Sequence, residues 1–152
     1  MAMAALRPQY GGTLVIGTSP GPTTMDPSRA LTADDWHLVS AVHEPLYRLN
    51  KHNQPVVNLL TRAPQTVKDG RAWRCTLRND IVFHSGQRMM SQDVIASVRR
   101  LKGTRFGWIP QQLRLKKITD TTFTIRSRRT IKTADLERIL ASPALSILPK
   151  KW

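Results

Sequence analysis

The segment 71–78 constrains the fold of this chain more than any other, because its apolar and polar residues alternate strictly. Successive side chains of a strand point to opposite faces, so the pattern predicts a half-buried strand with Trp73, Cys75 and Leu77 in the core. The residues between them are arginines and a threonine, which suit a solvated face. The preceding Lys68-Asp69-Gly70 is a strong turn signal, so this strand would start at a turn.

The remainder of the chain mixes helical and strand-like periods. Apolar residues recur at helical spacing over 33–46, over 134–141 and after Ser91, which is a candidate N-cap. Short β-rich runs occupy 81–83 and 121–125. Strands and helices at irregular spacing, without an internal repeat, predict an α+β domain.

Near the start, the glycine-bounded run 13–17 predicts a buried strand. A loop of small residues, prolines and hydroxyls follows it, and open sheets often bind ligands at such strand ends. We therefore take Thr18, Ser19, Pro20 and Gly21 as candidate ligand-binding residues. The alternative is that this loop only turns the chain, because glycine and proline form turns whatever the function.

Positive charge is concentrated in the second part of the chain. The formal net charge is +14, and residues 61–152 carry twenty Lys and Arg against six Asp and Glu, whereas residues 1–60 carry four of each. Such asymmetry favours an acidic partner: nucleic acid, an anionic membrane surface or an acidic protein. Trp73 is predicted to face the core, and the arginines follow no recognition-helix pattern, so a solvated basic surface is favoured over a nucleic-acid interface.

Catalytic and metal motifs are not found. The single cysteine, Cys75, excludes an intramolecular disulfide and a multi-cysteine metal site, and the four histidines lack zinc-ligand spacing. There is no nucleophile elbow and no glycine-rich phosphate loop, so we expect neither an enzyme nor a cofactor. His84 is interpreted as a turn residue. Residues 1–10 are predicted to be a disordered leader without an intact secretory signal, and no apolar run approaches the roughly 18 residues of a membrane span.

Several segments together follow a known family pattern. Residues 68–78, 82–86 and 91–94 match, with the same spacing, D-G-x-x-Y-T-F-x-L-R-x-x-V-x-F-H-D-G-x-x-x-T-A-x-D-V. Residues 11–17 and Met25-Asp26-Pro27 are similar to the first strand of that family and the Asp-Pro that follows it. On these residues the chain resembles the bacterial extracellular solute-binding proteins of family 5, the peptide-, dipeptide- and nickel-binding components of ABC transporters.

The chain also departs from the family pattern. Ser85 replaces the usual aspartate of F-H-D-G, and Ala63-Pro64-Gln65 stands where a tryptophan is usual. With 152 residues the chain is about a third of a usual member, so the resemblance implies residues 11–152 as a partial solute-binding domain. Its fold would be the first lobe of a type II periplasmic-binding-protein-like fold, truncated before the second lobe.

The resemblance implies solute binding for import, with a peptide-like ligand and ABC permease subunits as partners. The loop 18–21 would face the cleft between the lobes, and a chain with one lobe would lack full ligand clamping. The family location is periplasmic or extracellular; without a signal peptide, the product would be cytoplasmic if the chain is complete. Two alternatives stay open: a basic nucleic-acid- or anion-binding module, and a truncated relic without function.

Overall fold

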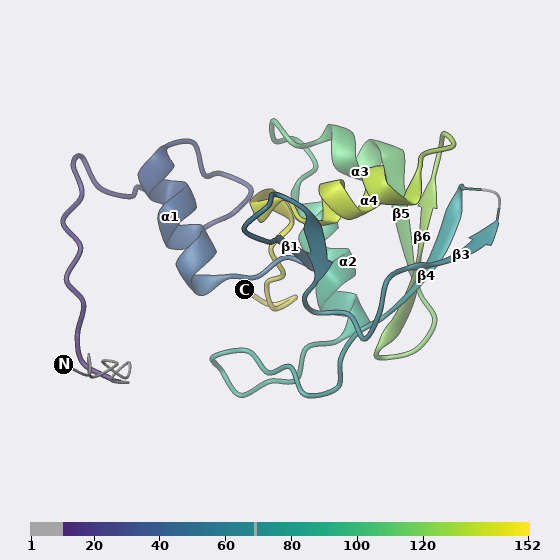
Figure 1. The fold of residues 1–152 in the computed structure, drawn as a ribbon, viewed down its shortest axis with the longest axis horizontal. Coiled ribbons are helices and arrows are strands. Elements are labelled where there is room, and N and C mark those ends of the chain that lie inside the picture. Colours follow the sequence, from purple (N-terminus) through teal and green to yellow (C-terminus); the bar gives the residue numbers. More distant parts are fainter. Residues whose placement is uncertain (1–10, 69) are drawn as a thin grey trace, which may run out of the picture.

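The computed structural model describes residues 11–68 and 70–152. The predicted disordered leader over 1–10 and the central Asp69 of the predicted turn lie outside the described residues. Figure 1 shows the arrangement of helices and strands. In chain order these are α1 (Ala33–Val42), β1 (Tyr47–Leu49), β2 (Pro55–Val57), β3 (Gln65–Lys68), β4 (Ala72–Thr76), α2 (Ser91–Arg100), α3 (Trp108–Gln112), β5 (Leu113–Lys117), β6 (Thr122–Ser127), α4 (Thr133–Leu140) and a short 3-10 turn (Pro143–Leu145).

A four-stranded antiparallel sheet in the order β3-β4-β6-β5 forms the centre of the fold. Trp73 pairs with Ile125 and Cys75 with Phe123, so the apolar residues of β4 and β6 share one face. These four side chains and Leu77 are at most 1% exposed, which confirms the predicted core face of the 71–78 segment. Mixed helices and antiparallel strands also confirm the α+β class.

Helices α2 and α4 pack against this core. Both match the predicted helices, with Val94 and Leu136 fully buried. Ser91 is not the cap that the sequence predicted, because it is the first helical residue and its Oγ donates to Thr119 O at 2.6 Å. The carboxylate of Asp93 takes the capping role by accepting from Met90 N at 2.7 Å. Among the described residues, no helix combines the length and apolarity needed to cross a membrane.

The first helix is shorter than predicted. It was expected to span 33–46, but α1 ends at Val42 and His43 already has extended backbone. The residue before a proline is disfavoured in helical conformation, so Glu44 before Pro45 prevents the helix from continuing. The chain then enters the β1–β2 hairpin, which was not predicted from the sequence.

The predicted buried strand over 13–17 is wrong. No residue of this segment pairs with a strand, and Leu14, Val15 and Ile16 are 83%, 87% and 73% exposed. A strand needs a neighbour for its backbone groups, and none of the described strands lies beside this segment. It runs as an arm from the N-terminal side to α1 (Figure 1). The sheet therefore does not carry the first strand; all of its strands lie within residues 65–127.

Candidate functional site

The loop predicted to bind ligand lies at the end of this arm. Thr18, Ser19 and Pro20 are exposed, and Gly21 is half-buried. The peptide bond between Ser19 and Pro20 is cis. Gly21 has a φ of +92°, in the region that side-chain-bearing residues rarely adopt, so glycine is needed at this position. The loop thus presents two hydroxyls and its backbone groups to solvent.

Asp35 fixes the chain directly after this loop. Its Oδ1 accepts from Thr23 N at 2.7 Å, Thr23 Oγ1 at 3.0 Å and Thr24 N at 3.1 Å. Its Oδ2 accepts from Leu31 N and Thr32 N, both at 3.0 Å. One side chain that is fully buried in the fold therefore joins the chain after the loop, at Thr23 and Thr24, to the turn before α1 and the first turn of α1.

These hydrogen bonds also keep the Asp35 side chain ionised. They stabilise the carboxylate, so backbone N–H groups of Thr32, Leu31 and Thr23 hold the pKa of Asp35 far below its usual range. Thr32 completes the arrangement because its Oγ1 accepts from Asp35 N at 3.1 Å, which makes a capping box at the start of α1. Asp35 was not identified as an anchor from the sequence. The Thr-x-x-Asp spacing was the signal that could have revealed the box.

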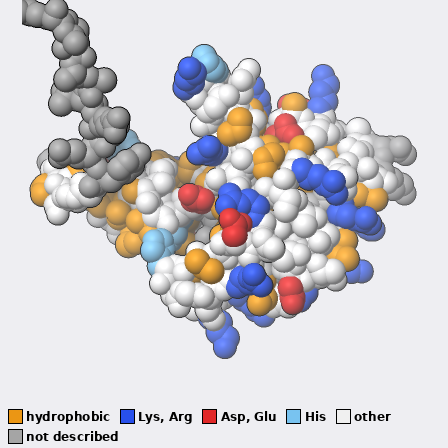
Figure 2. Space-filling view, turned by 60° about the horizontal axis from the view of Figure 1, so that its bottom comes forward, with side chains coloured by type: hydrophobic (Ala, Val, Ile, Leu, Met, Phe, Trp, Pro, Cys, Tyr) orange, Lys and Arg blue, Asp and Glu red, His pale blue; other side chains and the backbone are white. Residues whose placement is uncertain are grey.

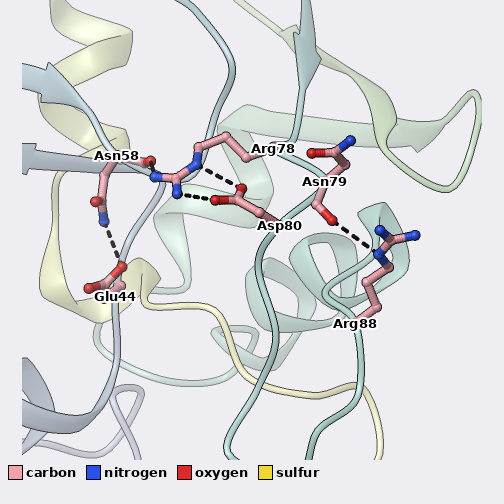
Figure 3. A network of polar contacts seen from close by, with 6 residues as sticks. All are labelled: Glu44, Asn58, Arg78, Asn79, Asp80 and Arg88. Atoms are coloured by element: carbon pink, nitrogen blue, oxygen red, sulfur yellow. Dashed lines mark hydrogen bonds and ion pairs between the residues drawn. The ribbon is translucent and has the colours of Figure 1, made fainter.

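The segment most similar to the family pattern forms a second polar network, drawn in Figure 3. Arg78 donates to both carboxylate oxygens of Asp80, at 3.0 and 2.6 Å, and to Asn58 O at 3.3 Å. Asn58 in turn donates to Glu44 at 3.1 Å, and Arg88 donates to Asn79 O at 3.0 Å. The hydrogen bonds from Arg78 lower the pKa of Asp80, which favours the ionised form of this carboxyl. The network connects the β1–β2 hairpin to the chain after β4.

The remaining reactive side chains have structural surroundings. Burial raises the pKa of Cys75 to about 12, so its thiol is a protonated core group, as the sequence indicated. His84 lies in the turn closed by Gly86 N to Phe83 O at 2.8 Å, which confirms the turn interpretation. Burial lowers the pKa of His43. In the part of the chain that the structure describes, no group of three or more His, Cys, Asp and Glu could hold a metal.

Comparison with known proteins gives both a family and a set of relatives. The family profile of the bacterial extracellular solute-binding proteins, family 5 Middle, matches residues 54–152. The chain is 30% identical over 128 residues to the HTH-type transcriptional regulator SgrR of Photorhabdus laumondii and 31% identical over 130 residues to SgrR of Yersinia enterocolitica. Each match covers 83% of this chain and 22% of the relative, so the chain spans about a fifth of their length.

Solved structures match over a larger share of the chain. Listeria monocytogenes OppA bound to peptide has a TM-score of 0.78 at 18% identity, covering 86% of this chain and 29% of that one. The Escherichia coli murein tripeptide binding protein MppA gives 0.76 at 18%, with the same coverage. AgaA of A. tumefacien R10, in complex with agropinic acid, gives 0.77 at 20%, covering 86% and 27%. At these identities the likeness shows the fold, which is part of a periplasmic-binding-protein fold, as predicted.

Proposed function

Because this chain belongs to the bacterial extracellular solute-binding proteins of family 5, we propose that it forms one wall of a binding site for a small, peptide-like solute. The loop Thr18–Gly21 supplies the contacts, through the hydroxyls of Thr18 and Ser19 and the backbone amides between them. These groups suit the amide and carboxylate groups of a short peptide, which need hydrogen-bond partners when they leave water.

The observation that carries this proposal is the anchoring of the loop by Asp35. Five donors converge on one carboxylate, and three of them belong to Thr23 and Thr24, which lie two and three residues beyond the loop. Asp35 caps α1 and at the same time fixes the chain next to the loop. A binding loop benefits from such an anchor, because groups held in place before the ligand arrives lose less conformational entropy on binding.

The more specific part of the proposal is that the bound solute is transported, as in an ABC importer. The solute would pass to an ABC permease outside the cytoplasmic membrane, and the second wall of the site would come from a further lobe. A single wall buries only part of a solute, so the 152-residue chain alone should bind short peptides weakly, on the order of millimolar, where the free energy of binding is about −4 kcal/mol.

Nuclear magnetic resonance titration tests the proposal directly. A neutral tripeptide added to the isotopically labelled chain should shift the amide resonances of Thr18, Ser19 and Gly21 in a saturable manner. The double variant Thr18→Ala/Ser19→Ala should weaken this binding, whereas Ser85→Ala, which removes an exposed hydroxyl at another turn, should not. Saturable shifts confined to the sheet, or equal affinity of both variants, would show that the loop is not the site.

The curated relatives favour a second candidate, in which the same wall serves a regulator. The proteins that match at 30% and 31% identity are named HTH-type transcriptional regulators. The lobe would then sense a solute and pass its occupancy to a DNA-binding part instead of a permease. Reading the DNA around this segment separates the two: a helix-turn-helix in the same frame supports the regulator, and a secretion signal supports the importer.

A further inference from the structure

A groove lies between α2 and β5, away from the loop 18–21. It consists of two adjoining cavities of about 530 and 610 Å³, which share Ile95 and Arg99 of α2 and Leu115 of β5 as lining residues. Each cavity has a size typical of ligand pockets. Ile95 and Leu115, with Val98 and Leu113 in the first cavity, provide an apolar floor.

Cations surround this floor. The first cavity is lined by Arg99, Lys102, Arg114 and Arg128. The second is lined by Arg99 again and by Arg100, Lys116, Lys117 and Lys150. No carboxylate lines either cavity, and within residues 11–68 and 70–152 only Lys117 of this set has an ion-pair partner, Asp120 at 2.5 Å. Lys and Arg side chains also outnumber acidic ones on the face in Figure 2.

The wall formed by β5 offers backbone groups as well. β5 is the last strand in the order β3-β4-β6-β5, so among the described strands only β6 pairs with it. Arg128 N donates to Gln112 O at 3.0 Å and Ile118 N to Thr122 O at 2.9 Å, which fixes the alternation of the ladder. The even-numbered residues of β5 therefore form the backbone hydrogen bonds to β6, and the N–H and C=O groups of Leu115 and Lys117 point away from β6.

We propose that this groove binds an extended acidic segment of a partner protein, which adds to the outer edge of β5. Carboxylates of the segment would pair with Arg99, Lys102 and Lys116, its apolar side chains would cover Ile95 and Leu115, and its backbone would bond to the free edge. A nucleic acid uses the charge but not the apolar floor. Single strands also rely on stacking with aromatic side chains, and no aromatic residue lines either cavity.

Fluorescence anisotropy with a labelled peptide of alternating glutamate and valine tests this site on the whole 152-residue chain. The peptide should bind saturably and lose affinity as salt increases. The double variant Arg99→Gln/Lys116→Gln should bind about three- to tenfold more weakly, since each exposed ion pair contributes modestly. The matched control Arg48→Gln/Arg62→Gln removes the same charge from exposed positions outside the groove and should bind like the unchanged chain.

Two further ligands distinguish the addition of a strand to β5 from attraction between charges alone. The same peptide with every backbone nitrogen methylated keeps its charge but cannot donate to the strand edge, so it should bind clearly more weakly. A short DNA duplex of equal charge should also bind more weakly. Equal binding of the methylated peptide, tighter binding of DNA, no saturable peptide binding, or equal effects of the two double variants would each overturn the proposal. Thr18→Ala/Ser19→Ala should leave the affinity for the acidic peptide unchanged, whereas weaker binding by this variant would place the peptide at the loop 18–21 and overturn the groove proposal.

Discussion

Ser97 allows the most direct test of how the chain after α4 is held to the core. This serine on α2 is 5% exposed, and its Oγ accepts from Leu148 N at 2.9 Å while it donates to Asp93 O at 2.9 Å. The substitution Ser97→Ala removes the acceptor and leaves the N–H of Leu148, whose residue is 2% exposed, without a partner. The carbonyl of Asp93 is less affected, because it lies within α2 and has helical hydrogen bonding available.

The expected loss of stability comes from the N–H of Leu148, because the carbonyl of Asp93 is less affected. A buried N–H without a partner costs about 1–3 kcal/mol, so a value of about 2 kcal/mol is expected for Ser97→Ala. For a chain of this length each kcal/mol lowers Tm by about 2–4 °C, which predicts a decrease of about 4–8 °C. Thermal unfolding followed by circular dichroism measures it, with Ser85→Ala at an exposed turn as control.

Hydrogen exchange shows whether the loss has the assigned cause. In Ser97→Ala the amide of Leu148 should exchange faster, while the amide of Ile147, which donates to Glu44 O at 2.9 Å, should keep its protection relative to global unfolding. A Tm within 1 °C of the control corresponds to a stability difference of at most about 0.5 kcal/mol, and this result would refute the reasoning. So would unchanged protection at Leu148.

Three other perturbations test separate parts of the structure. Asp35→Asn places an amide donor against donors of the loop, so limited proteolysis should cut near residues 18–24 faster; because the pKa of Asp35 is depressed, its stabilisation is present above its ordinary pKa of 3.8 and should be lost as pH falls below it. Cys75, with its pKa raised to about 12 from 9.0, should react with Ellman's reagent only after unfolding, since its thiolate fraction at mildly alkaline pH is about a thousandfold lower than that of a free thiol. The folded state holds the thiol proton more tightly, so stability from this group falls as pH rises above 9.0; a Cys75→Ala variant should lack this decline. The last change replaces three exposed arginines with glutamine: Arg126, Arg128 and Arg129. It should change Tm by less than about 2 °C and leave solute binding unchanged. If the chain were a nucleic-acid module, the same change would weaken DNA binding and flatten its salt dependence.

The elements predicted best from the sequence are those in which the spacing of apolar residues indicates which face is buried. Trp73, Cys75 and Leu77 alternate with charged or hydroxyl residues, and the sheet buries all three. The helices α2 and α4 were also found, because their apolar residues recur at a spacing that only a helix places on one face. In these segments local pattern and tertiary environment agree, so no knowledge of distant residues was needed.

The prediction failed where an element depends on a distant partner. Residues 13–17 have the composition of a strand, but a strand pairs only if another strand lies beside it, and none of those described does. The β1–β2 hairpin was missed for the opposite reason, because its three-residue strands are too short to show a period. Asp35 combines both cases: its capping box is local, whereas its bonds to Thr23 require the loop to fold back over twelve residues.

The cationic groove shows why composition predicts a kind of partner but not a place for it. The excess of Lys and Arg in residues 61–152 already favoured an acidic partner, yet its members are spread over helices and strands without any helical or strand period of their own. Arg99 and Lys116 become neighbours of one cavity only because the sheet order puts β5 at an edge and α2 packs beside it. Since like charges gathered on one surface repel each other, an anion that enters the groove relieves this repulsion and should raise the stability of the chain as it binds. The effect of the acidic peptide on Tm is therefore expected to disappear together with its affinity in Arg99→Gln/Lys116→Gln, which ties the placement of the charges, and not merely their number, to the proposed partner.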